Sequence, residues 1–270
     1  MKKIFFTICI FFFIDHESIS KEFDNVFIHH QVYNKINIIY YKIPQNKGVI
    51  RIVSPRFEHY LAAKSPSSII QNLAPDGSFI LDMVDYFKPD ALISGGYLSS
   101  LEPPIGLGGL KISERTLQPI HHSWLTNGIF CSSGTTWMIR DFVDKDDFYN
   151  DMDCLQAGPI LLQNGYNRYH DISLIDPNER KLALSLQDQA FLCTNNYGDL
   201  LMGFASGGTT KDLANLSKIE LGCLWTLRLS GSITAGLWTS SRGLDGHNEV
   251  RLTNGIAAFS LETIERQENK

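Results

Sequence analysis

The residues most suggestive of chemistry are small ones that follow a short apolar strand. The run Ser94-Gly95-Gly96-Tyr97 comes directly after residues 91–93, Ala-Leu-Ile. Glycine has no Cβ, so paired glycines let the backbone approach a ligand closely. The same pair can also simply turn a corner of the chain, and this run alone leaves both interpretations open.

Other motifs in the chain exclude several kinds of enzyme. In the glycine-rich run 106–109, Lys111 stands where a dinucleotide fingerprint needs its third glycine, and no crossover helix is expected after it. No G-x-S-x-G elbow is present, so no serine hydrolase triad can be assigned. Glu102 and the pair His121-His122 remain alternative acid or base candidates, although solvated or structural roles suit them as well.

The most acidic stretch lies between residues 141 and 153 and carries six aspartates. A calcium-binding loop of the EF-hand type needs a central glycine and a closing glutamate, and this stretch lacks both. We therefore interpret it as a solvated loop and assign no metal ligands from it.

Composition and charge limit the class of protein. The chain has 270 residues, of which 43% are hydrophobic and 20% charged, so it can bury a core and is not disordered. Its formal net charge is -5 and it has no dense cluster of Lys and Arg. A nucleic-acid partner is therefore not expected, because such binding needs a basic face.

The first twenty residues have the pattern of an export signal. Lys2 and Lys3 precede an apolar run over residues 4–14, and the small-x-small triplet Ser18-Ile19-Ser20 follows. This pattern predicts a signal peptide over residues 1–20 that is cleaved after Ser20, with an uncleaved anchor as the alternative. The run is shorter than the roughly 20 residues of a spanning helix. We expect a periplasmic or secreted protein without a membrane span after cleavage.

Four cysteines remain once the signal is removed, and no two of them form a C-x-x-C pair. A structural zinc site is therefore not expected. Three of them stand beside apolar residues, which favours buried free thiols at Cys131, Cys193 and Cys223. Export also permits disulfides, so one disulfide stays an alternative, and the sequence does not indicate which two cysteines would form it.

The pattern of elements predicts one α+β domain over residues 21–270, with mixed or antiparallel strands and a few helices. One helix is expected from an Asp76 cap to Pro89, and another over residues 211–219 with Thr210 as its cap. Strands are expected at the ranges that follow. They are residues 26–28, 36–43, 48–53, 91–93, 155–162 with an interruption at Gly158-Pro159, several within 181–204, and 224–229.

The order of the motifs resembles the phosphodiester glycosidase family over roughly residues 48–240. This family includes the mannose 6-phosphate uncovering enzyme and bacterial relatives associated with exopolysaccharide. The resemblance rests on five segments. They are residues 91–97, 104–107, 156–159, Arg180, and the helix that leads into residues 221–223 and then 228–234. It implies a hydrolase that cleaves the bond between a sugar anomeric carbon and a phosphodiester, and it leaves open a divalent cation such as calcium.

Site residues follow from this resemblance by position. The implied catalytic positions are Ser94, Arg180 and Ser230. The implied substrate-binding positions are Gly95, Gly96, Tyr97, Gln156, Gly158 and Gly231. Arg228 is a second arginine that could bind phosphate oxygens bidentately, with a surface role as the alternative. The expected partner is a carbohydrate or sugar phosphate.

The sequence departs from the family where the chemistry matters most. Ser94 stands where the family has Asn, Ser230 where it has Asp, and Ser99 where it often has Asp. A serine hydroxyl neither stabilises a cationic sugar as a carboxylate does nor acts as a general acid near neutral pH. The alternative function is therefore an inactive glycan-binding or scaffold protein of the periplasm that keeps the glycosidase fold, and a purely structural envelope protein is a third.

Overall fold

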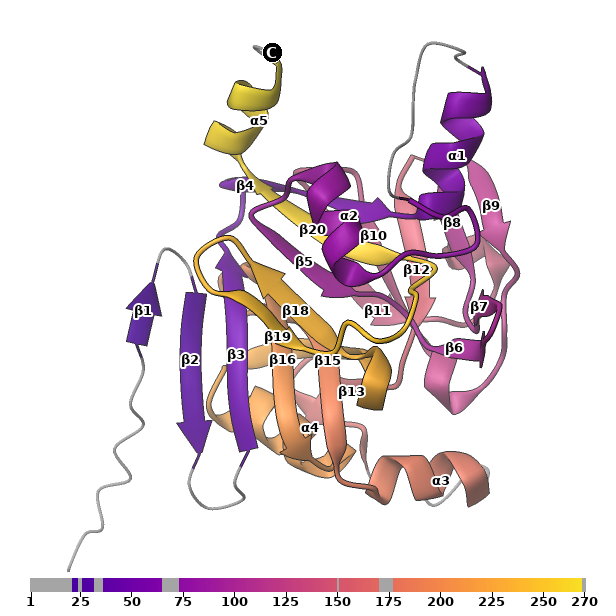
Figure 1. The fold of residues 1–270 in the computed structure, drawn as a ribbon. Helices are drawn as coiled ribbons and strands as arrows, with labels where there is room; N and C mark the ends of the chain where they lie inside the picture. The colour runs from indigo at the N-terminus through magenta and orange to yellow at the C-terminus, as the bar shows by residue number, and fades with distance from the viewer. Residues whose placement is uncertain are drawn as a thin grey trace, which may run out of the picture.

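The computed structural model describes residues 21–23, 26–31, 36–64, 73–149, 151–169 and 177–268. Within these ranges the strands form three large antiparallel sheets and one small hairpin, with α-helices packed outside them (Figure 1). This arrangement confirms the predicted α+β class. The predicted signal peptide, residues 1–20, lies outside the described residues.

The first sheet is the largest and has eight strands in the order β1-β2-β3-β16-β15-β17-β13-β14. Its central strands are rich in β-branched and aromatic residues, which suit a pleated, buried surface. Helix α4 (Thr210–Ile219) packs against β13, β16 and β17. The strands are β1 (Lys21–Phe23), β2 (Val26–Gln31), β3 (Ile36–Ile43), β13 (Ile160–Gln163), β14 (Tyr166–Asn167), β15 (Gln187–Asn195), β16 (Leu200–Gly208) and β17 (Cys223–Gly231).

The second sheet has five strands in the order β19-β18-β5-β20-β4. Helix α2 (Ile80–Phe87) packs against β5 and β18, and α5 (Leu261–Glu268) contacts β20. The strands are β4 (Gly48–Val53), β5 (Ala91–Ser94), β18 (Gly236–Thr239), β19 (Gly243–Gly246) and β20 (Gly255–Ser260).

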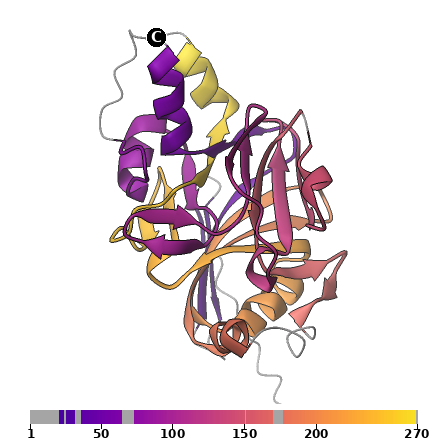
Figure 2. The same cartoon turned by 90° about the vertical axis from the view of Figure 1, so that its right-hand side faces the viewer.

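The third sheet also has five strands, in the order β11-β10-β12-β8-β9. A small hairpin of β6 and β7 precedes it in the chain. Helices α1 and α5 lie at the opposite end of the molecule from α3 and α4 in both views (Figures 1 and 2). The strands are β6 (Leu98–Leu101), β7 (Pro104–Gly106), β8 (Leu110–Ile112), β9 (Arg115–Gln118), β10 (Gly128–Ser132), β11 (Trp137–Asp141) and β12 (Asp153–Ala157).

Two of the sequence motifs are corners at which the chain passes from one sheet to another. Gly158-Pro159 joins β12 of the third sheet to β13 of the first. The 3-10 turn Ser232–Thr234 joins β17 of the first sheet to β18 of the second. Both motifs are therefore points where two sheets meet.

The main core lies among all three sheets. Ile93 of β5, Leu155 of β12 and Leu229 of β17 belong to one buried apolar cluster. Burying a side chain of this size stabilises the fold by about 1.5–3 kcal/mol. The sheets are therefore held together mainly by this shared cluster.

Two helix caps differ from the prediction. Helix α2 begins at Ile80, because Ser78 pairs with Leu252 and keeps the preceding residues out of the helix; Asp76 is not its cap. The cap of α4 is Thr209, whose hydroxyl accepts the Asp212 N–H at 3.2 Å. The Asp212 carboxylate accepts the Thr209 N–H in return, which completes a capping box one residue earlier than expected.

Three helices were missed. They are α1 (Pro55–Lys64), α3 (Pro177–Leu184) and α5. Residues 181–184 were expected to be strand, but they belong to α3. Proline at the first position of α1 and of α3 is the available signal, since its fixed φ suits a helix start. None of the helices in the described ranges has the length and apolar character needed to cross a bilayer.

The cysteines form two disulfides, so the predicted buried free thiols are wrong. Cys131 and Cys154 face each other across β10 and β12, and Cys193 of β15 joins Cys223 of β17. The spacing along the chain hid these pairs, because strand pairing brings together residues that are 23 and 30 positions apart.

We predict that replacing Cys131 and Cys154 together by alanine lowers the free energy of unfolding by about 3 kcal/mol. The reason is that a cross-link over a loop of this length restricts the unfolded chain. Urea unfolding of the variant and the native protein measures the difference. Alkylation of all four cysteines in unreduced, denatured protein would contradict the assignment.

Candidate functional site

Ser94 and Ser230, two of the positions where the sequence departs from the phosphodiester glycosidase pattern, lie in contact. Ser94 ends β5 and Ser230 lies near the end of β17, so the pair connects the second sheet to the first. Their hydroxyl oxygens are 2.8 Å apart, and both side chains are fully buried. The resemblance implied a catalytic position at each of these residues, which are 136 positions apart in the chain.

The protein uses the protons of both hydroxyls. The Gly236 N–H donates to the Ser94 oxygen at 3.1 Å, and the Ser230 hydroxyl donates to the Thr234 carbonyl at 3.2 Å. Each hydroxyl has one proton, so Ser94 must donate to Ser230 in this arrangement. The result is a continuous series of hydrogen bonds from Gly236 of β18 through both serines to Thr234 in the turn after β17. No carboxyl group takes part in it.

Arg228 lies two residues before Ser230 and is fully buried. Its Nη1 donates to the Thr210 hydroxyl at 2.7 Å, while Nε and Nη2 have no partner in the described part of the chain. No carboxylate of that part pairs with it. Burial lowers the pKa of this guanidinium. A buried cation without a counter-charge is costly, so the site favours an anion.

Tyr97 lies against this guanidinium. The Arg228 Cζ is 5.4 Å from the centre of the Tyr97 ring, a cation–π distance. The ring is half-buried, whereas its hydroxyl is buried and has no hydrogen-bond partner in the described ranges. Burial raises the pKa of Tyr97, and the Arg228 charge opposes that rise. The phenol is therefore a neutral donor next to two unpartnered N–H groups.

Gly231 provides space for Arg228. A Cβ at Gly231 would overlap the Arg228 guanidinium and come within 2.7 Å of the Gln187 amide oxygen. The backbone N–H of Arg228 donates to the Pro159 carbonyl at 3.1 Å, and this bond connects Arg228 to the Gly158-Pro159 corner. The predicted position Gly231 is therefore in the same cluster as Ser230 and Tyr97.

Gly95 and Gly96 pack against Asn254 rather than against open space. The Asn254 side-chain oxygen accepts the Gly96 N–H at 3.0 Å, and its carbonyl accepts the Gly95 N–H at 3.2 Å. A Cβ at Gly95 would overlap the Asn254 side chain, and one at Gly96 would lie 3.3 Å from the Gln156 carbonyl. The close approach that these glycines permit is an approach between backbone segments of this chain.

Gln156 is fully buried, and protein groups occupy its hydrogen-bonding capacity. Its side-chain oxygen accepts the N–H groups of Gly109 and His121 at 2.8 and 3.1 Å. Its amide nitrogen donates to the carbonyls of His121 and Thr126 at 2.6 and 2.8 Å. A side-chain amide has two donors and two lone pairs. This residue therefore positions the 121–126 segment.

Other predicted residues lie apart from the Ser94–Ser230 contact. Arg180 is on an exposed face of α3. Gly158 packs at a corner, where a Cβ would be 3.0 Å from the Asn127 N–H nitrogen. The alternatives Glu102 and His121 are both exposed.

The sequence analysis missed the pair of Asp188 and His247. The His247 Nε2 lies 3.0 Å from the Asp188 carboxylate, and both side chains are about 30% exposed. The His247 N–H donates to the Ala235 carbonyl at 3.0 Å, directly after the turn that follows Ser230. No spacing in the chain could have indicated this pair, because its members are 59 residues apart.

The residues at this site do not fit a calcium ion. Calcium binds six to eight oxygens, and carboxylates supply its charge balance. At this site Ser94 and Ser230 present hydroxyls that already bond to each other, beside the positive charge of Arg228. In the part of the chain that the structure describes, no cluster of three or more His, Cys, Asp or Glu could hold a metal.

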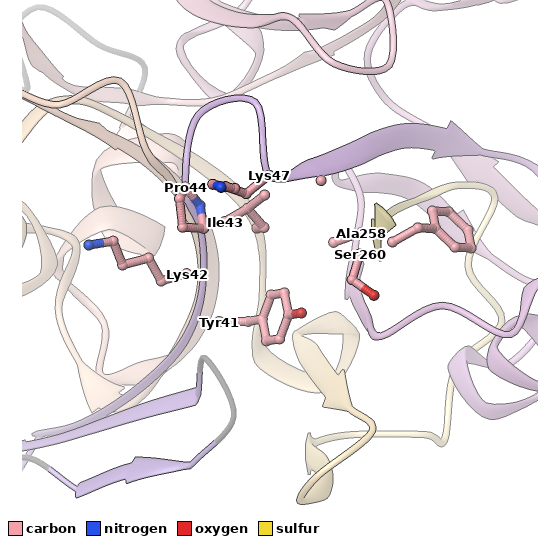
Figure 3. A pocket seen from close by; sticks show the side chains of 9 residues that line it. Tyr41, Lys42, Ile43, Pro44, Lys47, Ala258 and Ser260 are labelled. Carbon is pink, nitrogen blue, oxygen red and sulfur yellow. The ribbon is translucent and has the colours of Figure 1, made fainter. Parts of the chain in front are cut away.

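A separate cleft of about 320 Å³ lies between the β3–β4 turn and β20. Figure 3 shows that the Tyr41 ring extends toward Ser260, whereas Lys42 points to the other side of β3. The Lys42 ammonium pairs with Asp199 at 3.0 Å. Most of the exposed lining is apolar, and it includes none of the predicted site residues.

No protein-family model matches the sequence, and no curated protein matches it in sequence. Solved structures are similar in fold. The catalytic domain of zebrafish N-acetylglucosamine-1-phosphodiester alpha-N-acetylglucosaminidase, auto-inhibited by its pro-peptide, matches with a TM-score of 0.61 at 11% identity, over 87% of this chain and 78% of that one.

Two bacterial structures are also similar. A Burkholderia pseudomallei protein described as exported has a TM-score of 0.58 at 8% identity, over 87% of this chain and 74% of that one. A hypothetical Synechocystis protein has a TM-score of 0.56 at 8% identity, over 87% of this chain and 62% of that one. This chain therefore shares the fold of a phosphodiester glycosidase domain.

We predict that Ser94→Ala and Ser230→Ala each lower the free energy of unfolding by about 1–3 kcal/mol, because each leaves buried polar groups unpaired. The double variant should lose less than the sum of the two, since the shared hydrogen bond is removed only once. Urea unfolding measures all three, with the exposed Ser241→Ala as the control. Strict additivity would contradict the contact.

Proposed function

We propose that this protein binds an anionic glycan, such as a sugar 1-phosphodiester, without cleaving it. The observation that supports this function is the buried pair Ser94–Ser230 beside the unpartnered guanidinium of Arg228. The serine pair lacks the carboxyl groups that glycoside hydrolysis uses, and the guanidinium favours a bound anion. The fold similarity to a phosphodiester glycosidase domain supports the class of ligand.

The phosphate would bind to Arg228 and Tyr97. The Nε and Nη2 atoms can donate to two phosphate oxygens at once, and the neutral Tyr97 hydroxyl can donate to a third. Because Arg228 is fully buried and Tyr97 is half-buried against it, the Tyr97 ring must move for a ligand to enter. In this proposal Arg228, rather than the exposed Arg180, contacts the anion.

We further propose that the mature chain, residues 21–270, is a single domain that acts in the periplasm or outside the cell. The pattern of residues 1–20 supports export. Two disulfides fit an oxidising compartment, and one structural neighbour is described as exported.

We predict that Arg228→Gln lowers the affinity for the methyl diester of N-acetylglucosamine 1-phosphate at least about tenfold, because a bidentate charged contact is lost. Isothermal titration calorimetry of the native protein and the variant measures the effect. Arg180→Gln is the matched control and should bind as the native protein does. If only the Arg180→Gln variant loses affinity, the anion binds at Arg180 and the proposed site is wrong.

We also predict that Arg228→Met raises the free energy of unfolding of the ligand-free protein by about 1–4 kcal/mol. Replacing a buried charge by an apolar side chain of similar length removes its desolvation penalty. Denaturant unfolding measures this, with the exposed Arg251→Met as the control. A loss of stability at Arg228 would mean that the guanidinium is a structural group.

One observation favours a second candidate function, hydrolysis by residues outside the family motifs. A carboxylate can orient an imidazole as a general acid or base, and Asp188 and His247 lie in contact beside the turn at 232–234. If the native protein releases a phosphate monoester from the diester, Asp188→Asn should abolish most of that release. Asp245→Asn, which changes a carboxylate paired with Arg242, is the control.

A further inference from the structure

A second cleft, whose lining does not include Arg228, is built around two tryptophans. We call it the tryptophan cleft and define it by Gln45, Thr135, Thr136, Trp137, Met138, Ile139, Thr194, Asn195, Gly198 and Trp225. Its volume is about 240 Å³. It opens where the third sheet meets the first, because Trp137 begins β11 and Trp225 lies in β17.

We propose that the tryptophan cleft binds a neutral sugar residue. This site is separate from the proposed anion site, because Trp225 precedes Arg228 by three residues on the same strand. That is a span of about 10 Å, and an odd offset along a strand places the two side chains on opposite faces of the sheet. The proposal does not depend on the function proposed above.

The aromatic walls suit the apolar face of a sugar ring. Trp137 and Trp225 are both half-buried and pack against the main core, so their positions are fixed by apolar contacts. A rigid indole supplies a large flat contact area with one N–H donor, which suits a ligand that is apolar on its face and polar at its edge. Sugar rings have this combination of C–H face and hydroxyl edge.

The polar lining is neutral and has unused hydrogen-bonding capacity. None of the ten lining residues carries a charge, which favours an uncharged ligand over a phosphorylated one. In the described ranges, the side chains of Gln45, Thr135 and Thr194 form no hydrogen bond with the protein. A few free hydroxyl and amide groups around an aromatic wall are the usual composition of a small-molecule site.

One wall of the cleft is held in place by Asp199. This buried carboxylate accepts the Gln45 N–H at 3.3 Å and the Asn195 side-chain N–H at 3.1 Å, and it pairs with Lys42 at 3.0 Å. The Asn195 side-chain oxygen accepts the N–H groups of Tyr197 and Asp199 in return. Asp199 is therefore a positioning residue that joins the β3–β4 turn to the β15–β16 turn.

A disulfide fixes the other side. Thr194 of β15 lies opposite Trp225 of β17, and the bond between Cys193 and Cys223 crosses these strands beside that pair. A site held by packing, a carboxylate network and a cross-link needs little ordering when a ligand binds, which favours affinity.

The test is a titration of the mature chain with neutral oligosaccharides of glucose and of N-acetylglucosamine. Calorimetry and tryptophan fluorescence measure the binding. We expect binding that Trp137→Ala and Gln45→Ala each weaken at least about tenfold. Trp238→Phe, in the second sheet, should leave the affinity unchanged, and so should Arg228→Gln. The conservative Trp137→Phe should keep part of the affinity, and near-UV circular dichroism checks that each variant is folded.

Two results would overturn the proposal. One is that the native chain binds none of these sugars or the members of a neutral glycan array. The other is that binding occurs but survives both Trp137→Ala and Gln45→Ala in folded variants. Because Arg228→Gln is included, a failure here is distinguishable from a failure of the anion site.

Discussion

The hydrogen bond between Ser94 and Ser230 is the contact on which the candidate site depends, because it joins the second sheet to the first. The strand ends that meet there also position Gly95 and Gly96 on one side and Arg228 and Gly231 on the other. The pair is buried and its protons are used within the chain Gly236, Ser94, Ser230, Thr234. Hydroxyls in this arrangement stabilise a junction between sheets, and no carboxyl group is present there to protonate a leaving group.

Arg228 is the feature that a purely structural role explains least. An unpaired guanidinium in a core costs free energy. A ligand that brings the opposite charge would offset this cost. The adjacent Tyr97 phenol adds a donor and covers the guanidinium from one side. The same cluster that lacks hydrolytic groups therefore keeps groups that favour an anion.

The sequence predicted the local features of this fold well and the long-range ones only through the family resemblance. The strand before Ser94 and the helix over residues 211–219 follow from residues adjacent in the chain. The order of motifs assigned Ser94 and Ser230 to one implied site, since no periodicity connects positions so far apart, but their contact was not predicted. The burial of Arg228 and the disulfides could not be predicted, because strand pairing decides both, and arginine is usually exposed. Gln156 was expected to bind substrate, but four backbone groups from segments 30 to 47 residues away use its amide.

The most direct test is a phosphorus-31 NMR time course of the mature protein with the methyl diester of N-acetylglucosamine 1-phosphate. The account predicts that the diester resonance shifts or broadens as protein is added and that no monoester resonance appears. A growing monoester resonance would show that this chain cleaves its ligand. A diester resonance that protein does not change would show that the Arg228 cluster binds no such anion.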